Sequence, residues 1–292
     1  MASYHIVQKL MISVVINTYN AERHLERVLE SVRDFDEIVV CDMESTDRTV
    51  EIARSHGCKV VTFPKGSHVC AEPARTFAIQ SASNPWVLVV DADELVTPAL
   101  RAYLYEQIRR DDAPNGIYIP RKNYFMGRMM HCHYPDYILR FFVREGTVWP
   151  PYVHTLPIVQ GRTEKIPASR TDLAFEHLAK DTVADILRKT NLYTENELEK
   201  KHGKRYGIMA FLWRPFFRWF KAYVIKGGFR DGLPGFIRAC LEAHYQFIML
   251  SKMAEARREA FASSATKALA GNGDELRSRD IGQSGGTAGR NG

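Results

Sequence analysis

Two carboxylates stand two residues apart at the end of an apolar run, in the segment Val89-Val-Asp-Ala-Asp-Glu94. On an extended backbone Asp91 and Asp93 point to the same side. Carboxylates in this arrangement can share a hard divalent cation and leave positions open for phosphate oxygens. The segment also suits a plain turn from a strand into a helix, with Asp93 or Glu94 near the start of the helix. Taken alone, it leaves both interpretations open.

A second carboxylate follows another apolar run. Asp42 comes directly after residues 37–41, and Ser45 and Thr46 follow it. Capping of the next helix explains Ser45 and Thr46. It explains Asp42 less well. A carboxylate directly after a buried strand can instead accept hydrogen bonds from a base imide or a ribose hydroxyl.

A third polar group follows the apolar run at residues 12–16. It consists of Thr18, Asn20 and Glu22. Their backbone and side-chain groups can border a nucleotide, which makes all three candidate contacts for a nucleotide. Taken alone, Asn20 is equally well explained as the N-cap of a helix.

The elements that must position these residues alternate between strands and helices. Strands are predicted at residues 12–16, 37–41, 59–63 and 86–90, and helices after Asn20 and at 47–56, 73–82 and 98–110. Alternation with short links predicts an α/β fold with a Rossmann-like, mostly parallel sheet. Such sheets bind ligands at the carboxyl ends of their strands, so we expect the three polar groups to meet at one edge.

The second half of the chain is less regular. Segments 116–120, 137–143 and 155–159 are predicted as strands of a mixed extension of the sheet, and the chain becomes helical from about residue 181. We therefore expect a leader at 1–10, an α/β domain at 11–180 and a basic, aromatic helical region at 181–263. Residues 264–292 hold 7 of the 19 glycines and no aromatic residue, which predicts a disordered tail.

The charge of the protein is unevenly distributed. The whole chain carries 40 Lys and Arg against 34 Asp and Glu, a net charge of +6, whereas residues 200–263 alone hold 13 against 4. The five cysteines are scattered, which favours a reducing compartment. Residues 1–9 lack the long apolar core of a signal peptide, and no apolar run is long enough to span a membrane.

The basic region is also rich in aromatic residues. Arg214, Arg218 and Lys221 fall on one helical face, and Pro215 would kink the helix or start a second one. A cationic stripe with aromatic flanks suits the headgroup layer of an anionic membrane, although the aromatics can also be the core of a helical subdomain. No nucleic-acid-binding motif accompanies the patch, so nucleic acid is not an expected partner. Eight aromatics lie in this stretch: Tyr206, Phe211, Trp213, Phe216, Phe217, Trp219, Phe220 and Tyr223.

The histidines give weaker indications. His131-Cys132-His133 is spaced too tightly to close a tetrahedral zinc shell, and no second pair of ligands is evident, so zinc is not expected. His154 and His177 are open to two interpretations, as hydrogen-bonded structural residues or as part of an acceptor site.

The three polar groups and their strands resemble the family-2 glycosyltransferases of the GT-A fold. Three later motifs resemble the subgroup that acts on the lipopolysaccharide core, and the resemblance covers roughly residues 11–255. The first set of segments is 13–20, 38–47 and 87–94, and the second is Ile119-Pro-Arg-Lys-Asn-Tyr-Phe-Met-Gly-Arg128, 134–142 and Lys226-Gly-Gly-Phe-Arg-Asp-Gly232.

The resemblance implies roles for particular residues. Thr18, Glu22 and Asp42 would contact the nucleotide. Asp91 and Asp93 would hold Mg²⁺ or Mn²⁺, which neutralises charge on the departing nucleoside diphosphate. Two arginines, Arg75 and Arg140, could reach the phosphates, although Arg75 also suits a solvated helix face. Arg144 is better explained as a surface residue.

An inverting transfer also needs a base for the acceptor hydroxyl. Asp136, between Pro135 and Tyr137, is the candidate, although Pro-Asp is also common turn chemistry. Relatives carry an acidic residue directly after the histidine that corresponds to His154, and this chain has Thr155 there.

Together these features predict a metal-assisted, inverting glycosyltransferase on the cytoplasmic face of a membrane. It would move a sugar from a nucleotide-sugar to a lipid-linked or lipopolysaccharide-core glycan. Two alternatives remain open at this stage: a polyprenyl-phosphate sugar synthase that uses the same donor site, and a catalytically inactive membrane-bound scaffold.

Overall fold

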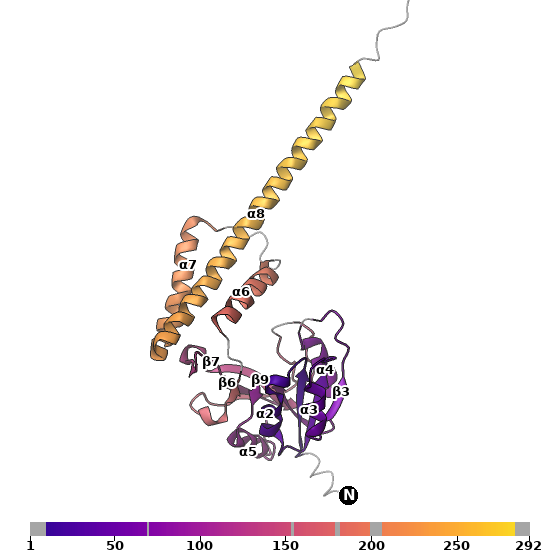
Figure 1. The fold of residues 1–292 in the computed structure, drawn as a ribbon, viewed down its shortest axis with the longest axis vertical. Coiled ribbons are helices and arrows are strands. Elements are labelled where there is room, and N and C mark those ends of the chain that lie inside the picture. The colour runs from indigo at the N-terminus through magenta and orange to yellow at the C-terminus, as the bar shows by residue number, and fades with distance from the viewer. Residues whose placement is uncertain (1–9, 69, 153–154, 179–181, 199–205, 284–292) are drawn as a thin grey trace, which may run out of the picture. The chain divides into compact units, whose positions relative to one another are not determined.

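A computed structural model describes residues 10–68, 70–152, 155–178, 182–198 and 206–283 of the chain (Figure 1). The described residues form two compact units. The α/β unit comprises those up to Thr182 together with Lys226–Gly235, and the helical unit comprises Val183–Ile225 and the chain from Phe236 onward. The boundary expected after residue 180 lies two residues from this division. Residues 226–235, expected in the helical region, instead belong to the α/β unit.

The α/β unit is built on a nine-stranded sheet, and its parallel part with a mixed extension confirms the predicted fold class. Four parallel strands lie in the order β3-β2-β1-β4, and the sheet continues through β9, β6, β11 and β5, with β10 beside β6. Strand β9 is antiparallel to both β4 and β6, and β5 is antiparallel to β11. The strands are β1 (Ile12–Thr18), β2 (Glu37–Asp42), β3 (Lys59–Thr62), β4 (Trp86–Asp91), β5 (Glu94–Leu95), β6 (Gly116–Lys122), β9 (Asp136–Val143), β10 (Thr163–Lys165) and β11 (Phe175–His177).

Helices cover both faces of the sheet. Side chains that alternate along β1 face opposite cores: Ile12, Val14 and Ile16 pack with α2 (Glu22–Val32), α3 (Thr49–Ser55) and α5 (Pro98–Gln107). Val15 packs on the other face, with α4 (Glu72–Gln80). Every residue of β1 is buried. The β-branched composition of this strand therefore reflects burial on both faces.

Two local predictions are wrong. Asn20 does not cap α2, which follows Ala21 without a side-chain cap, because Asn20 adopts φ +50° and bonds to the next loop instead. Residues 155–159 form no strand, and their described contact with another extended segment is a single bridge between Ile158 and Val148. The prolines at 150, 151 and 157 remove the amide donors that a longer ladder would need.

A small hairpin and three short 3₁₀ turns among the described residues complete the α/β unit. The hairpin pairs β7 (Tyr124–Phe125) with β8 (Arg128–Met129), and the turn η1 (His131–His133) follows it. The second turn, η2, covers Thr171–Leu173, and the third, η5, covers Gly228–Asp231. The hairpin and η1 lie between β6 and β9, so they belong to the loop that ends at Asp136.

The helical unit contains α6 (Val183–Leu198), α7 (Ile208–Phe220), the π-turn η4 (Lys221–Ile225) and most of α8 (Gly232–Gln283). Pro215 lies inside α7, and no residue of α7 is buried. No described helix is long and apolar enough to cross a membrane.

Helix α8 continues to Gln283, so the prediction of a disordered tail from residue 264 differs from the structure over residues 264–283. Alanine, leucine, lysine, arginine and glutamate are frequent between 264 and 279, and their helix propensity outweighs the glycines there. Residues 284–292 and most of the expected leader, residues 1–9, lie outside the described residues.

Candidate active site

The carboxyl ends of β1, β2 and β4 meet at one edge of the sheet, as predicted. In the parallel register Thr18 lies opposite Asp42, and Asn17 lies opposite Asp91. The Thr18 hydroxyl donates to Asp42 Oδ1 over 2.9 Å, and both residues are buried. The backbone N–H and the hydroxyl of Ser45 also donate to the Asp42 carboxylate. Asp42 is therefore held in one orientation at the edge.

Asn20 and Glu22 lie at the same edge, where they join two loops. The Thr46 N–H donates to Asn20 Oδ1 over 2.8 Å. The Arg48 N–H donates to Glu22 Oε2 over 3.0 Å. The loop after β1 is thus bonded to the loop after β2, and these two side chains shape the edge through backbone contacts.

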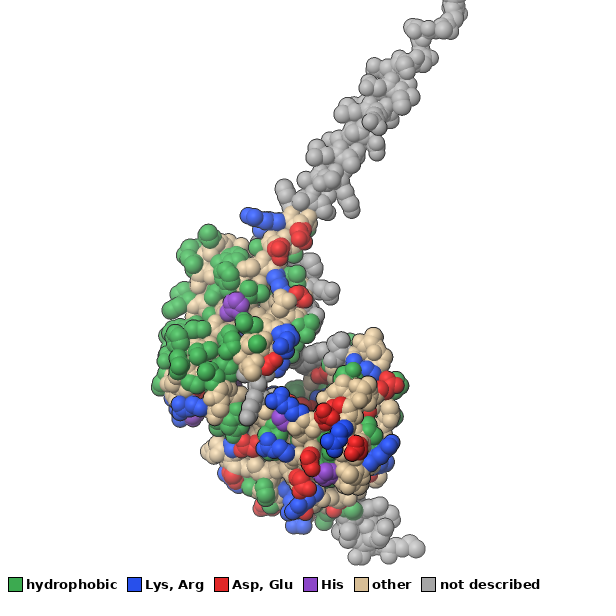
Figure 2. Space-filling model, in the orientation of Figure 1, with side chains coloured by type: hydrophobic (Ala, Val, Ile, Leu, Met, Phe, Trp, Pro, Cys, Tyr) green, Lys and Arg blue, Asp and Glu red, His purple; other side chains and the backbone are tan. Residues whose placement is uncertain are grey.

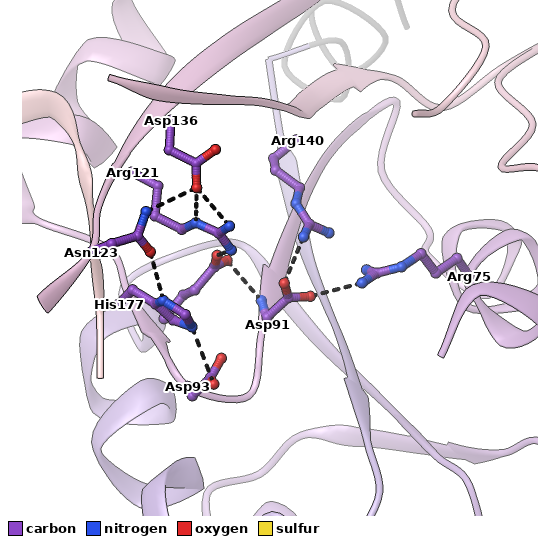
Figure 3. A network of polar contacts seen from close by, with 9 residues as sticks. Arg75, Asp91, Asp93, Arg121, Asn123, Asp136, Arg140 and His177 are labelled. Atoms are coloured by element: carbon purple, nitrogen blue, oxygen red, sulfur yellow. Dashed lines mark hydrogen bonds and ion pairs between the residues drawn. The ribbon is translucent and has the colours of Figure 1, made fainter. Parts of the chain in front are cut away.

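Asp91 lies between two buried arginines (Figure 3). Arg75 Nη2 donates to Asp91 Oδ1 over 2.9 Å, and Arg140 Nη2 donates to Oδ2 over 2.6 Å. Burial alone would raise the pKa of Asp91, but the guanidinium groups of Arg140 and Arg75 outweigh it and hold this pKa well below its usual range. Both guanidinium groups also lie over the ring of Trp149, with their Cζ atoms 4.5 and 5.2 Å from its centre.

This cluster has more buried donors than acceptors. Arg75 Nε and Nη1, Arg140 Nη1 and Trp149 Nε1 are buried and have no hydrogen-bond partner among the described residues. Buried donors without partners are costly, so the cluster suits a ligand rich in oxygen. Arg144, by contrast, donates to the Asn84 carbonyl, away from Asp91.

A second network starts from the same strand end. Glu94 is wholly buried; it accepts from the Asp91 N–H over 3.1 Å and from Arg121 Nη1 over 2.9 Å. Arg121 also donates from Nε and Nη2 to Asp136 Oδ2, over 3.0 and 2.7 Å. Burial and the neighbouring Asp91 raise the pKa of Glu94. Burial lowers the pKa of Arg121, but its two carboxylate partners raise it overall. Sequence reasoning assigned no role to Arg121, although it lies inside one of the quoted motifs.

Asp136, the predicted base, receives its hydrogen bonds on one oxygen. Its Oδ2 accepts from Arg121 and from Asn123 Nδ2, the latter over 3.0 Å. No hydrogen bond from the described residues reaches Oδ1, and the side chain is partly exposed. Burial raises the pKa of Asp136, but Arg121 and Asn123 outweigh this effect and lower it. The group is therefore a carboxylate at neutral pH, and its Oδ1 receives no hydrogen bond found among the described residues.

His177 connects this network to Asp93. The Asn123 amide nitrogen donates to Asp136, so its Oδ1 faces His177 Nδ1, over 2.9 Å. Nδ1 then carries the proton, and in a neutral imidazole Nε2 is an acceptor. Nε2 lies 3.3 Å from Asp93 Oδ2, which is also an acceptor. Only a proton or a cation between these two atoms makes their approach favourable.

Backbone pairing between two short strands places His177 next to Asp93. Strand β11 pairs with the two-residue strand β5 so that His177 lies opposite Glu94. The Leu178 N–H donates to the Asp93 carbonyl over 2.6 Å. Asp93 was expected to act together with Asp91, but the structure gives the two carboxylates different partners: arginines for Asp91 and His177 for Asp93.

The remaining candidates lie elsewhere or outside the described residues. His131 contacts Asp231, and no group of three or more histidine, cysteine, aspartate or glutamate side chains among the described residues could hold a metal ion. Thr155 Oγ1 donates to the carbonyls of Pro150 and Tyr152, which closes a turn. His154 lies outside the described residues.

Comparison with known proteins finds similarity to glycosyltransferases. The sequence model described as Glycosyl transferase family 2 matches residues 13–156. The lipopolysaccharide core biosynthesis glycosyltransferase LpsC of Rhizobium meliloti (strain 1021) is 27% identical over 268 residues, 85% of this chain and 93% of that protein. An uncharacterised glycosyltransferase of Rickettsia bellii (strain RML369-C) is 26% identical over 265 residues, 84% of this chain and 86% of that protein.

A solved structure, S. aureus TarS 1-349 in complex with UDP, is 17% identical and covers 86% of this chain and 92% of its own, with a TM-score of 0.44. The family match spans the sheet edge from Thr18 to Asp136 and Arg140; of the site residues, His177 lies beyond it. The chain is therefore a glycosyltransferase that is similar to family 2 over residues 13–156, and this match lies on its α/β sheet.

Proposed function

We propose that this glycosyltransferase moves a sugar, with inversion and metal assistance, from a nucleotide-sugar to a lipid-linked or lipopolysaccharide-core glycan. The buried donors around Asp91 carry the proposal. The free N–H groups of Arg75, Arg140 and Trp149 suit oxygens of the nucleotide part of the donor. Asp42, held by Thr18 a strand away, suits a base imide or a ribose hydroxyl.

Asp93 and His177 are the residues that would hold the metal. Two facing acceptors 3.3 Å apart fit a cation such as Mn²⁺, which accepts both carboxylate and imidazole ligands. The Nδ1–H of His177 bonds to Asn123, as a second-shell partner of a metal-bound histidine does. When bound, the ion would supply positive charge for the departing diphosphate. Asp91 would instead keep the two arginines in place.

Asp136 would act as the base. Its Oδ1 can accept the proton of the acceptor hydroxyl as that oxygen attacks the anomeric carbon. Arg121 and Asn123 fix the other oxygen, so the carboxylate cannot turn away. Thr155 closes a turn and has no acidic group, so this role falls to Asp136 rather than to the residue after His154.

The acceptor is proposed to lie at a membrane. Similarity to LpsC supports a lipopolysaccharide-core glycan. Helix α7 has large apolar side chains exposed along its length, and hydrophobic side chains gather over α7 in Figure 2. Basic residues Arg214 and Lys221 are interleaved with them, a composition that suits the headgroup layer of an anionic membrane. We place the enzyme on the cytoplasmic face of the cell membrane.

The donor part of the proposal is tested by nucleotide-sugar turnover. The purified chain is incubated with UDP- and GDP-sugars, with and without Mn²⁺, and release of the nucleoside diphosphate is measured. We expect metal-dependent release with at least one donor, and a kcat about 10²- to 10⁴-fold lower in Asp136→Asn. Asp172→Asn, which loses an exposed pair with Arg170, is the matched control. Release that is unchanged in Asp136→Asn would rule out this base.

The membrane part is tested by co-sedimentation with anionic vesicles. Binding should weaken as salt is raised, because screening reduces the attraction between the basic side chains and the lipid headgroups. A chain that stays in the supernatant at low salt contradicts membrane docking and leaves the donor site unaffected.

A further inference from the structure

The segment Lys226–Gly235, which we name the clasp, is fixed to the loop that carries the candidate base. Asp231 is buried, with an exposed fraction of 1%. Its Oδ1 accepts from the backbone N–H of His131 over 3.0 Å, and its Oδ2 accepts from that of Cys132 over 3.4 Å. Both donors belong to η1, five residues or fewer before Asp136. The clasp therefore holds the end of the active-site loop.

Glycines make the clasp tight. A Cβ atom on Gly235 would lie 1.9 Å from the Gly228 carbonyl oxygen, so no side chain fits there. Gly227 adopts φ +74°, the left-handed region that glycine favours. This packing turns two large apolar side chains outward: Phe229 is 56% exposed and Leu233 is 67% exposed. Their exposure therefore follows from the close backbone packing at Gly228 and Gly235.

The β7–β8 hairpin lies beside the clasp. Arg128 Nη1 would be 3.6 Å from a Cβ atom placed on Gly232. Met126, at the tip of the hairpin, is 55% exposed. The two segments together present three apolar and three basic exposed side chains. We name these six residues the lip: Met126, Arg128, Lys226, Phe229, Arg230 and Leu233.

Some exposed arginines of the α/β unit are paired with carboxylates, whereas the cations of the lip lie next to exposed apolar side chains. Arg33, Arg110 and Arg170 each pair with a neighbouring carboxylate. Within the described part of the chain, no ion pair is found for the three basic residues of the lip. The only carboxylate of the clasp is Asp231, and it is buried on η1. The lip thus combines unpaired positive charge with exposed apolar groups.

We propose that the lip inserts into the headgroup layer of an anionic lipid bilayer, with its apolar side chains at the acyl boundary and its cations among the phosphates. Apolar side chains flanked by lysine and arginine are typical of such interfacial contacts. The proposal rests on the proposed function in one respect: a membrane-borne acceptor would then approach the loop that the clasp holds and that ends at Asp136 without leaving the bilayer. Docking through the lip is distinct from docking through α7, because the lip belongs to the α/β unit.

An environment-sensitive fluorophore tests the lip directly. It is attached to Leu233→Cys or Met126→Cys in the full chain, and vesicles of phosphatidylglycerol and phosphatidylethanolamine are added. We expect a blue-shifted, brighter emission that vesicles of phosphatidylcholine do not produce. Asp111→Cys, at an exposed site of the α/β unit away from the lip, should show no change. The background replaces the accessible cysteines by serine: Cys58, Cys70 and Cys240.

A label at Leu212→Cys on α7 separates the two docking surfaces. If this label shifts with anionic vesicles while those at Leu233 and Met126 keep a water-like emission, the lip does not dock and the proposal is wrong. A shift at the lip that follows protein concentration without vesicles would show contact with a second copy instead, and would also overturn it.

Charge removal gives a second readout. Lys226→Gln with Arg230→Gln should weaken binding to the anionic vesicles about 25-fold, at about fivefold for each basic residue near the surface. Arg54→Gln with Arg109→Gln, also exposed on the α/β unit, should bind like the parent chain. Release of nucleoside diphosphate should be unchanged in both. Equal vesicle binding by the two double variants contradicts the proposal, whereas a parent chain without turnover contradicts only the proposed function.

Discussion

Changing Asp91 to asparagine and changing Asp93 to asparagine should have different effects on stability and on activation by Mn²⁺. The structure pairs Asp91 with two buried guanidinium groups and Asp93 with His177. We expect Asp91→Asn to destabilise the α/β unit strongly, and Asp93→Asn to leave its stability near that of the parent while abolishing activation by Mn²⁺. The prediction separates a carboxylate that supports the site from one that would hold the metal.

The size of the effect follows from the geometry. Asp91 contacts Arg75 and Arg140 at 2.9 and 2.6 Å, and its side chain is only 27% exposed. At about 4 Å between charge centres and an effective dielectric constant of about 20, each pair contributes about 4 kcal/mol. Desolvation offsets part of this sum, but a variant that leaves both guanidinium groups buried without a countercharge should lose about 3–5 kcal/mol.

Urea denaturation measures this loss. Hydrogen exchange of peptides that cover β1 and β4 reports the α/β unit alone. With a denaturant slope of at most about 3 kcal/mol per molar, the midpoint should fall by about 1 M or more. Adding Arg75→Met to Asp91→Asn should restore part of the loss, because one uncompensated charge is then removed. Asp172→Asn should not shift the midpoint. An unchanged midpoint in Asp91→Asn would refute the reasoning.

Three further changes have expected outcomes. Asn123→Ala should raise the Mn²⁺ concentration for half-maximal turnover about 10- to 100-fold, because His177 loses its orienting partner; an unchanged metal titration would contradict it. Gly235→Ala should abolish soluble expression or unfold near room temperature, whereas Gly207→Ala, with open space around it, should not. Glu37→Gln should reduce the loss of stability as the pH falls, and the melting temperature measured against pH would show this. Burial raises the pKa of Glu37, but hydrogen bonds from Ser13 and Ser83 lower it overall, so its contribution is present above the unfolded pKa of about 4.3 and is lost as pH falls through the folded pKa. Parent and variant curves of identical shape would refute that role.

The parallel half of the site could be predicted because its signals are local. Each of β1, β2 and β4 is an apolar run that ends in a polar residue, and parallel strands bring such ends to one edge. Thr18 and Asp42 are hydrogen-bonded there, and Asp91 contacts both Arg75 and Arg140.

The part of the site on the antiparallel strands β9, β11 and β5 and the neighbouring β6 could not be predicted in the same way. His177 reaches Asp93 because β11 and β5, of three and two residues, pair with each other, and strands this short leave no periodic pattern. Arg121 and Asn123 lie in the segment 119–128, but the sequence predicted no role for them because nothing local shows that their side chains meet Asp136. Asp231 binds η1 from a hundred residues away in sequence, a separation that no local pattern reports.

The most direct test of the proposed donor site is a structure of the chain with UDP and Mn²⁺, and a second with GDP and Mn²⁺. We predict that one nucleotide binds at the carboxyl ends of β1, β2 and β4, with its oxygens within about 3.2 Å of the free nitrogens of Arg75 or Arg140. The ion should lie between Asp93 and His177. A nucleotide bound away from this edge, or an ion held by Asp91 in place of its arginines, would contradict the assignment of the site.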